Sequence, residues 1–226
     1  MLRAVIFDFD GVIVDSEPVH AAALREALHA EGLTLSIEQY DAEYLGLCDR
    51  EIVEGVYRGA GRALARADLA RVMAAKREHM ERAIRAGACR PYGGSVALLR
   101  SAAALLPVAV CSGALRHEVD AVLAWLGLAG LPAALTTAEE TPRSKPDPAP
   151  YVLTLEKLGL GATGCVAIED TARGVASAKG AGLAAVGVCH TMTARELMLA
   201  GADLVVEGSD ALSLDALEAL ASERGV

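Results

Sequence analysis

Six short apolar segments, each bounded by turn-forming residues, constrain the fold of this chain more than any other feature. They lie at residues 4–9, 108–112, 134–138, 165–170, 184–189 and 203–208. Between most of them, as in 93–106, 114–127 and 148–161, apolar residues recur at the i, i+3 and i+4 spacing of an amphipathic helix. Apolar strands that alternate with helices are typical of a parallel sheet covered on both faces. We therefore predict an α/β fold with a doubly wound, Rossmann-like parallel sheet.

The alternation is interrupted from residue 16 to residue 88, where helical patterns occur without a convincing strand. Four helices are expected there, over 17–32, 36–46, 49–59 and 66–87. We interpret 16–88 as a helical cap domain inserted after the first strand, which leaves 1–15 and 89–226 as the α/β catalytic core. Asp15, Ser16 and Pro18 are expected to end the core segment and to begin the first cap helix.

The charge of the chain excludes some classes of partner. A net charge of -9 argues against a nucleic-acid binder, which normally has a basic face for the phosphate backbone, so we expect no nucleic-acid partner. The stretch 121–138 is uncharged and long enough to imitate a membrane span, but Gly127, Gly130 and Pro132 divide it into a helix end, a turn and a strand. We therefore expect no membrane partner.

The cysteines and the N-terminal residues bear on the compartment. The five cysteines include no C-x-x-C pair and no Cys/His cluster of zinc-like spacing, which favours buried free thiols in a reducing environment. The first residues show neither a basic region nor a cleavage site of a signal peptide. We expect a cytoplasmic protein, either a monomer or a small homo-oligomer.

Asp8 and Asp10 lie at the end of the first expected strand. Residues i and i+2 of an extended chain point the same way, so both carboxylates face the carboxyl edge of the sheet, where open α/β sheets bind ligands. Gly11 then permits a tight turn. Such a pair suits covalent phosphoryl transfer, with one nucleophile and one proton shuttle. An isolated D-x-D is equally consistent with a solvated turn.

A second apolar strand ends in Glu169 and Asp170, again at a carboxyl end. Together with Asp8 and Asp10, these acids could supply the oxygen ligands that Mg²⁺ prefers. The alternative is that Asp170 or Thr171 only caps the helix that follows. The two interpretations are compatible, because one residue can cap the helix while another binds the metal ion.

Two further positions could bind a phosphoryl group. Ser112 and Gly113 follow a third strand and precede a helix, where a hydroxyl and free amides form a natural phosphate cradle. Lys145 lies in a loop stiffened by four prolines. Taken singly, the serine is more often a helix cap, and a loop lysine is normally solvated.

In chain order these motifs are DFDG (8–11), Ser112, Lys145 and Glu169-Asp170, and together they resemble the four motifs of the haloacid dehalogenase (HAD) superfamily. The resemblance covers essentially the whole chain. It extends to DSEPVH (15–20), LGLCDRE (45–51) and RPYGG (90–94). The chain is similar to the helical-cap subgroup of this superfamily, which includes β-phosphoglucomutase and small sugar-phosphate phosphatases.

The resemblance implies a role for each motif residue. Asp8 would be the nucleophile and a metal ligand, and Asp10 would be the general acid and base and would bind the metal through its backbone carbonyl. Ser112, Gly113 and Lys145 would hold the phosphoryl group. Glu169 and Asp170 would complete the site of the cofactor, Mg²⁺. In the cap, Arg50, His20 and Lys76 are candidates for substrate contact, each weighed against ordinary surface or hinge roles.

These expectations combine into a HAD-type phosphatase, a phosphoric monoester hydrolase. It would hydrolyse a small phosphorylated metabolite, such as a sugar phosphate, through an aspartyl-phosphate on Asp8. One alternative is a β-phosphoglucomutase-type isomerase, which returns the phosphoryl group to a second hydroxyl; DSEP at the hinge favours the phosphatases mildly. A remote alternative is a non-catalytic metabolite-binding module, which the presence of every motif residue disfavours.

Overall fold

The chain forms two compact units in a computed structural model that describes residues 1–44 and 47–223. One unit comprises Met1–Asp15 and Arg90–Val226, and the other comprises Ser16–Cys89. The expected boundary placed residue 89 in the first unit, whereas Cys89 falls in the second.

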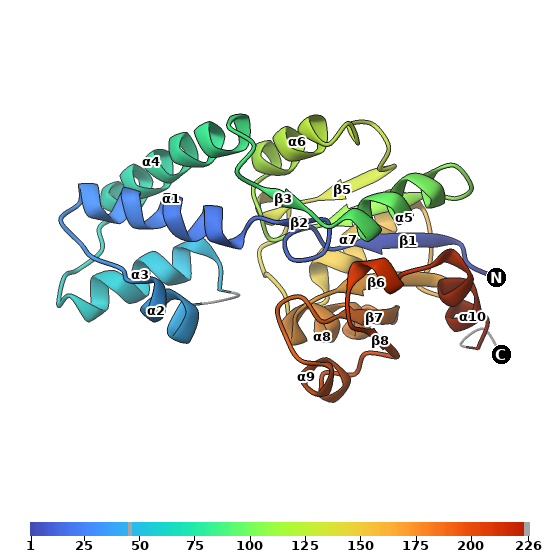
Figure 1. The fold of residues 1–226 in the computed structure, drawn as a ribbon. Coiled ribbons are helices and arrows are strands. Elements are labelled where there is room, and N and C mark those ends of the chain that lie inside the picture. Colours follow the sequence, from blue (N-terminus) through green and yellow to red (C-terminus); the bar gives the residue numbers. More distant parts are fainter. Residues whose placement is uncertain (45–46, 224–226) are drawn as a thin grey trace. The chain divides into compact units, whose positions relative to one another are not determined.

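Within the described residues, the first unit is built on a six-stranded sheet (Figure 1). Its order is β5-β4-β1-β6-β7-β8, and every neighbouring pair is parallel. The strands are β1 (Ala4–Phe7), β4 (Val108–Cys111), β5 (Ala134–Thr136), β6 (Cys165–Glu169), β7 (Ala184–Val188) and β8 (Leu204–Val206). Each lies inside one of the six apolar segments, so the prediction of a doubly wound α/β fold is confirmed.

Helices alternate with these strands as the sequence indicated. They are α5 (Gly93–Ala103), α6 (Arg116–Trp125), α7 (Ala149–Leu158), α8 (Ala172–Gly180), α9 (Ala194–Leu199) and α10 (Leu214–Glu223), with short 3₁₀ turns η2 (Ala138–Glu140) and η3 (Ser209–Ala211). On one face of the sheet, Ala109, Ala167 and Ala185 pack against Tyr151 of α7 and Val175 of α8. Small side chains in the strands let these helices approach closely.

The central strand β1 lies at the switch point of the sheet. From β1 the chain moves to β4 and then β5 on one side, and it returns to β6, β7 and β8 on the other side. Right-handed crossovers therefore place α5 and α6 on the face opposite to α7, α8 and α9. Side chains at the carboxyl ends of β1, β4 and β6 meet where such sheets bind ligands.

A two-stranded ribbon, which the sequence did not predict, pairs the two chain segments that lead to and from the insertion. Strands β2 (Val14–Asp15) and β3 (Arg90–Pro91) are antiparallel, with Val14 opposite Pro91 and Asp15 opposite Arg90. A pair of two-residue strands gives too little periodicity to be recognised in a sequence.

The second unit is helical, as expected. It contains α1 (Glu17–Ala30), α2 (Ile37–Gln39), the π-helical turn η1 (Tyr40–Tyr44), α3 (Asp49–Gly59) and α4 (Arg66–Arg85) around a core that includes Leu28, Ile52 and Val72. Ser36 caps the second helix by accepting a hydrogen bond from the Gln39 backbone N–H at 3.0 Å. Residues 45 and 46, which belong to the expected helix 36–46 and to the motif 45–51, lie outside the described residues.

The uncharged stretch 121–138 forms the three pieces that the sequence indicated. Helix α6 ends at Trp125, Gly127 and Gly130 follow with φ of 64° and 79°, and β5 begins at Ala134. In the part of the chain that the structure describes, no helix combines the length and the hydropathy needed to cross a bilayer.

Candidate active site

The loop after β1 carries the first two acids. Strand β1 ends at Phe7, and the Asp8 backbone N–H still donates to the Ile168 carbonyl of β6 at 2.9 Å. The chain then turns at Gly11, which adopts a φ of +76°. A Cβ atom at Gly11 would lie 1.8 Å from Oδ2 of Asp170. Only glycine therefore allows this loop to lie against the end of β6.

Three buried carboxylates come together at the carboxyl ends of β1 and β6. Asp8, Glu169 and Asp170 each offer one oxygen, and these three oxygens lie within 4.8 Å of one another. The residues are 8%, 0% and 2% exposed. Helix α8 accommodates this cluster because it has glycine at position 174, where a Cβ atom would lie 1.8 Å from Oε2 of Glu169.

Lys145 is the cation of this cluster. Its ammonium contacts Oδ1 of Asp8 at 2.8 Å and Oε1 of Glu169 at 2.7 Å, and it donates to the Cys111 carbonyl of β4 at 2.8 Å. Tyr151 donates its hydroxyl hydrogen to the same Glu169 oxygen at 2.6 Å. The lysine therefore links the ends of β1, β4 and β6.

Helix α8 holds the loop that carries Lys145. The Arg173 guanidinium donates to the Lys145 carbonyl at 2.7 Å, and the Ser177 hydroxyl donates to the Asp147 carbonyl at 2.6 Å. Arg173 and Ser177 are four residues apart and so lie on one face of the helix. The position of the lysine is thus set by contacts to its own carbonyl and to the carbonyl two residues further along the chain.

The burial of these groups perturbs their protonation. Burial raises the pKa of Asp8 well above its usual value, and the charge of Glu169 adds to this effect against the opposing effect of Lys145. Burial, followed by the charge of Glu169, raises the pKa of Asp170 to about 7. Burial alone would lower the pKa of Lys145, but Asp8 and Glu169 raise it well above its usual value. The site therefore has an excess of negative charge.

Two oxygens of the cluster are suited to a hard cation. Oε2 of Glu169 and Oδ1 of Asp170 are buried and accept no hydrogen bond from any residue that the structure describes. An unsatisfied buried carboxylate oxygen is costly unless a cation or a donor contacts it. With the Asp8 carboxylate nearby, the donor set is the all-oxygen type that Mg²⁺ prefers. The carboxylate of Asp10 is not part of this cluster.

Ser112 lies directly after β4 and is 4% exposed. Its hydroxyl oxygen accepts from the Ala114 N–H at 2.9 Å, and the hydroxyl is 3.5 Å from Oδ2 of Asp10. We expected Ser112 and Gly113 to open directly into a helix, but α6 begins only at Arg116. Gly113 is therefore an exposed loop residue, and any phosphate cradle here uses loop amides.

The helix-cap alternative at the end of β6 is resolved by Thr171. Its hydroxyl accepts from the Gly174 N–H at 3.1 Å, so Thr171 is the N-cap of α8. Asp170 instead accepts a hydrogen bond from the Thr191 hydroxyl of the loop after β7. The Asp170 carboxylate is therefore not used to cap the helix.

The three candidates in the inserted unit have different surroundings. Lys76 is 2% exposed, and its ammonium lies 2.5 Å from Oδ2 of Asp49 and 2.9 Å from Nδ1 of His20. Arg50 is an exposed side chain that pairs with Glu54 at 2.8 Å. The structure thus brings Lys76 and His20 together, but not Arg50, and it adds Asp49, which the sequence did not single out.

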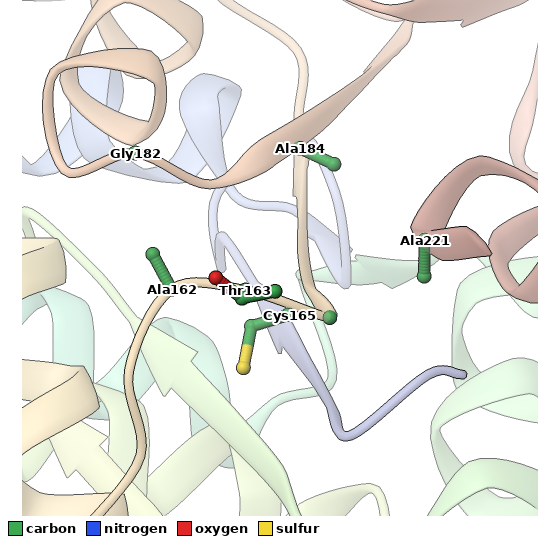
Figure 2. A pocket seen from close by; sticks show the side chains of 7 residues that line it. Ala162, Thr163, Cys165, Gly182, Ala184 and Ala221 are labelled. Atoms are coloured by element: carbon green, nitrogen blue, oxygen red, sulfur yellow. The ribbon is translucent and has the colours of Figure 1, made fainter. Parts of the chain in front are cut away.

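A hollow at the opposite, amino-terminal end of β6 and β7 has a different character (Figure 2). It measures about 150 Å³ and is lined by Ala162, Thr163, Gly164, Cys165, Gly182, Ala184 and Ala221. Its lining includes no charged side chain. The buried carboxylates and Lys145 lie instead at the carboxyl edge, which is the candidate active site.

The fold and this edge together define an α/β enzyme with a carboxylate-lined site at the switch point of its sheet. Residues 2–182 match the haloacid dehalogenase-like hydrolases, and the chain belongs to this family. Fructose-1-phosphate phosphatase YqaB of Escherichia coli is 31% identical over 189 residues, which cover 81% of this chain and 95% of that protein. The prediction of a HAD-type enzyme is confirmed at this level.

Solved structures support the same assignment. The structure of CbbY from Rhodobacter sphaeroides in complex with phosphate superposes with a TM-score of 0.87 at 25% identity and covers 96% of this chain and 100% of that one. β-Phosphoglucomutase from Clostridium difficile has a TM-score of 0.85 at 21% identity, with 99% and 98% covered. The second likeness shows a shared fold.

Proposed function

We propose that this protein is a Mg²⁺-dependent phosphomonoesterase that hydrolyses a small phosphorylated metabolite through an aspartyl-phosphate on Asp8. The observation that carries the proposal is the contact of Lys145 with both Asp8 and Glu169 beside two carboxylate oxygens that lack protein donors. Phosphoryl transfer requires charge neutralisation and positioning more than covalent work by the protein. This arrangement supplies both.

In the first half-reaction a carboxylate oxygen of Asp8 attacks phosphorus, and the bond from phosphorus to the ester oxygen breaks. Asp10 gives its carboxyl proton to the departing oxygen, which leaves as an alcohol. Lys145 contacts Oδ1 of Asp8 at 2.8 Å and so offsets the charge that the phosphoryl group brings towards this carboxylate. Ser112 and the amides near Gly113 hold the non-reacting phosphoryl oxygens.

In the second half-reaction the Asp10 carboxylate takes a proton from water. The water oxygen attacks phosphorus, and the bond from phosphorus to the Asp8 oxygen breaks. Inorganic phosphate leaves, and both acids return to their starting protonation. The proximity of the Ser112 hydroxyl to Oδ2 of Asp10, 3.5 Å, supports a role for Asp10 at the phosphoryl-binding edge of the site.

Asp8, Glu169 and Asp170 would hold the Mg²⁺ ion, together with the backbone carbonyl of Asp10. The ion, when bound, supplies positive charge that offsets the repulsion among these carboxylates and the substrate phosphate. The excess of acids over the single Lys145 ammonium supports this assignment.

We propose that the substrate is a sugar phosphate or a related polyol phosphate in the cytoplasm. The likeness to fructose-1-phosphate phosphatase YqaB and to CbbY with phosphate supports this class. Lys76, His20 and Arg50 of the inserted unit are the proposed specificity residues. Lys76 is the strongest of the three because Asp49 and His20 hold it out of solvent.

The test is phosphate release across a panel of sugar and glycolytic phosphates, with Mg²⁺ and with a chelator. We expect release that requires Mg²⁺ and that is lost in Asp8→Asn, since the amide is a poor nucleophile. Activity that is indifferent to the chelator would contradict the metal site, and unchanged activity in Asp8→Asn would remove the nucleophile.

The β-phosphoglucomutase-type alternative is separated by the same assay. An isomerase moves the phosphoryl group to another hydroxyl of the sugar and releases little phosphate, whereas the phosphatase needs no bisphosphate activator. Binding of a metabolite without turnover in every condition would instead favour a non-catalytic module.

A further inference from the structure

His190 lies in the loop after β7 and contacts the DFDG loop through its ring. Its Nδ1 atom is 2.7 Å from the carbonyl oxygen of Gly11, and its Nε2 atom accepts from the backbone N–H of Ser209 at 3.2 Å. His190 therefore joins the loop after β1 to the 3₁₀ turn η3, which is distant in the sequence.

These two contacts fix the tautomer of the ring. The Ser209 N–H can only donate, so Nε2 must carry a lone pair, and the Gly11 carbonyl can only accept, so Nδ1 must carry the hydrogen. A neutral Nδ1–H imidazole satisfies both partners at once. The opposite tautomer would satisfy neither of them.

The ring is also held on its face. Tyr92 stacks on His190 with the ring centroids 3.7 Å apart and the planes 9° from parallel. The backbone N–H of Tyr92 donates at 3.0 Å to the carbonyl of Ile13, which follows the DFDG motif in the same loop between β1 and β2. The same loop is thus contacted by the histidine and by the residue that stacks on it.

Gly11 needs such a contact because glycine restrains its own dihedral angles least. The peptide before Gly11 is held within the loop, since the Gly11 N–H donates to the Val14 carbonyl at 2.8 Å. The peptide after Gly11 is held by the His190 side chain. The two hydrogen bonds together define the turn that directly follows Asp10.

We propose that His190 is a positioning residue that orients the Asp10–Gly11 turn for proton transfer, through the hydrogen bond from its Nδ1–H to the Gly11 carbonyl. The inference rests on the proposed function, since it assigns the proton transfer to Asp10. The adjacent Thr191 hydroxyl donates to Asp170, so one loop contacts both acidic strand ends.

Two substitutions separate the two sides of the ring. In His190→Asn the amide nitrogen can take the place of Nδ1 and keep the bond to Gly11, whereas in His190→Gln the amide lies near the place of Nε2. The exposed His29→Gln is the matched control. Each variant is assayed for kcat/KM with an alkyl phosphate, whose leaving group needs a proton, and with an aryl phosphate, whose leaving group does not.

We expect His190→Gln to lower the ratio of alkyl to aryl kcat/KM by about tenfold, part of the usual contribution of general acid catalysis. His190→Asn and His29→Gln should keep the ratio within about twofold of the unsubstituted protein. The ratio does not depend on the folded fraction, so a purely structural loss leaves it unchanged. An unchanged ratio in His190→Gln overturns the proposal.

A second measurement does not depend on activity. In ¹⁵N-histidine spectra of the unsubstituted protein at about pH 8, the His190 signal is assigned as the one that is absent from the His190→Asn spectrum. Because an unperturbed histidine is neutral at this pH, the signal should have the pattern of the Nδ1–H tautomer. An Nε2–H tautomer would overturn the geometry. If the unsubstituted protein releases no phosphate from these two substrates or from the panel of sugar and glycolytic phosphates, the proposed function fails, and the tautomer still tests the contact separately.

Discussion

Replacement of Asp170 by Asn should make the metal-free protein more stable while it removes activity. Asn keeps the size of the side chain and an oxygen that can accept from the Thr191 hydroxyl, so the packing is preserved. It removes one negative charge from a cluster in which Glu169 and Asp8 are also buried. The substitution thus isolates the cost of an ionised carboxylate at this position.

The size of this cost follows from the pKa of Asp170, which burial and the charge of Glu169 raise from 3.8 to about 7. The shift is about 3 pKa units, and at 1.36 kcal/mol per unit it corresponds to about 4 kcal/mol. Below about pH 4 both the folded and the unfolded state bind the proton, so no cost arises. The folded state loses this free energy as the pH rises from about 4 to 7, and above that the whole cost is present.

Urea unfolding in a chelator, at several pH values, measures the effect. The single tryptophan, Trp125, lies on α6 in the unit that carries Asp170, so its fluorescence reports on that unit. At about pH 8 the Asp170→Asn variant should exceed the unsubstituted protein by up to about 4 kcal/mol, and the difference should vanish towards about pH 4. The exposed Asp210→Asn serves as the control.

Mg²⁺ should narrow this difference at high pH. At about 100 times its Kd, a ligand that binds only the folded state adds about 2.7 kcal/mol, which the variant should largely lose together with its phosphate release. If Asp170→Asn is no more stable than the unsubstituted protein in chelator at about pH 8, the electrostatic reasoning is wrong. A difference that does not change with pH would refute it equally.

Two further substitutions test neighbouring parts of the site. Lys145→Met should abolish phosphate release and lower the free energy of unfolding at about pH 8, because Asp8 and Glu169 lose their counter-ion. The pKa of Asp8 then rises further, so acidification should restore part of the lost free energy of unfolding. A free energy of unfolding that falls on acidification would contradict this reasoning. Gly174→Ala should lower the free energy of unfolding in urea by at least about 2 kcal/mol, because the new Cβ would lie 1.8 Å from Oε2 of Glu169. In the control Gly161→Ala the new Cβ has no neighbouring atom within 4 Å, so the free energy of unfolding should change little. Equal losses in the two variants would refute the steric argument.

The strands of the sheet were predictable because each is apolar on both faces, a pattern that survives without knowledge of its neighbours. The motif residues were predictable because strand ends meet at one edge, which brings Asp8, Glu169 and Asp170 together. The start of α6 was not predictable, because the helical periodicity of the sequence extends back to residue 114 whereas the helix begins at Arg116. The Ala114 N–H donates to the Ser112 hydroxyl in a loop contact instead.

Contacts between distant segments left no local signal. Tyr151 reads as one more apolar position of a helix, yet its hydroxyl meets Glu169. Arg173 reads as a solvated helix residue, yet its guanidinium holds the Lys145 carbonyl. His190 has no partner pattern near it in the sequence, because its partners lie at Gly11, Tyr92 and Ser209. Such contacts follow from the tertiary fold alone.

The pairing of β2 with β3 means that the inserted unit leaves and rejoins the sheet-bearing unit at adjacent residues, Asp15 and Arg90. Antiparallel neighbours can be joined by a two-residue turn. The segment Ser16–Cys89 is therefore an insertion between two paired strands. If a short hairpin turn replaced it, Asp8, Lys145 and Asp170 would still belong to one continuous sheet-bearing unit. The residues of the proposed catalytic site and the proposed specificity residues thus belong to separate units of one chain.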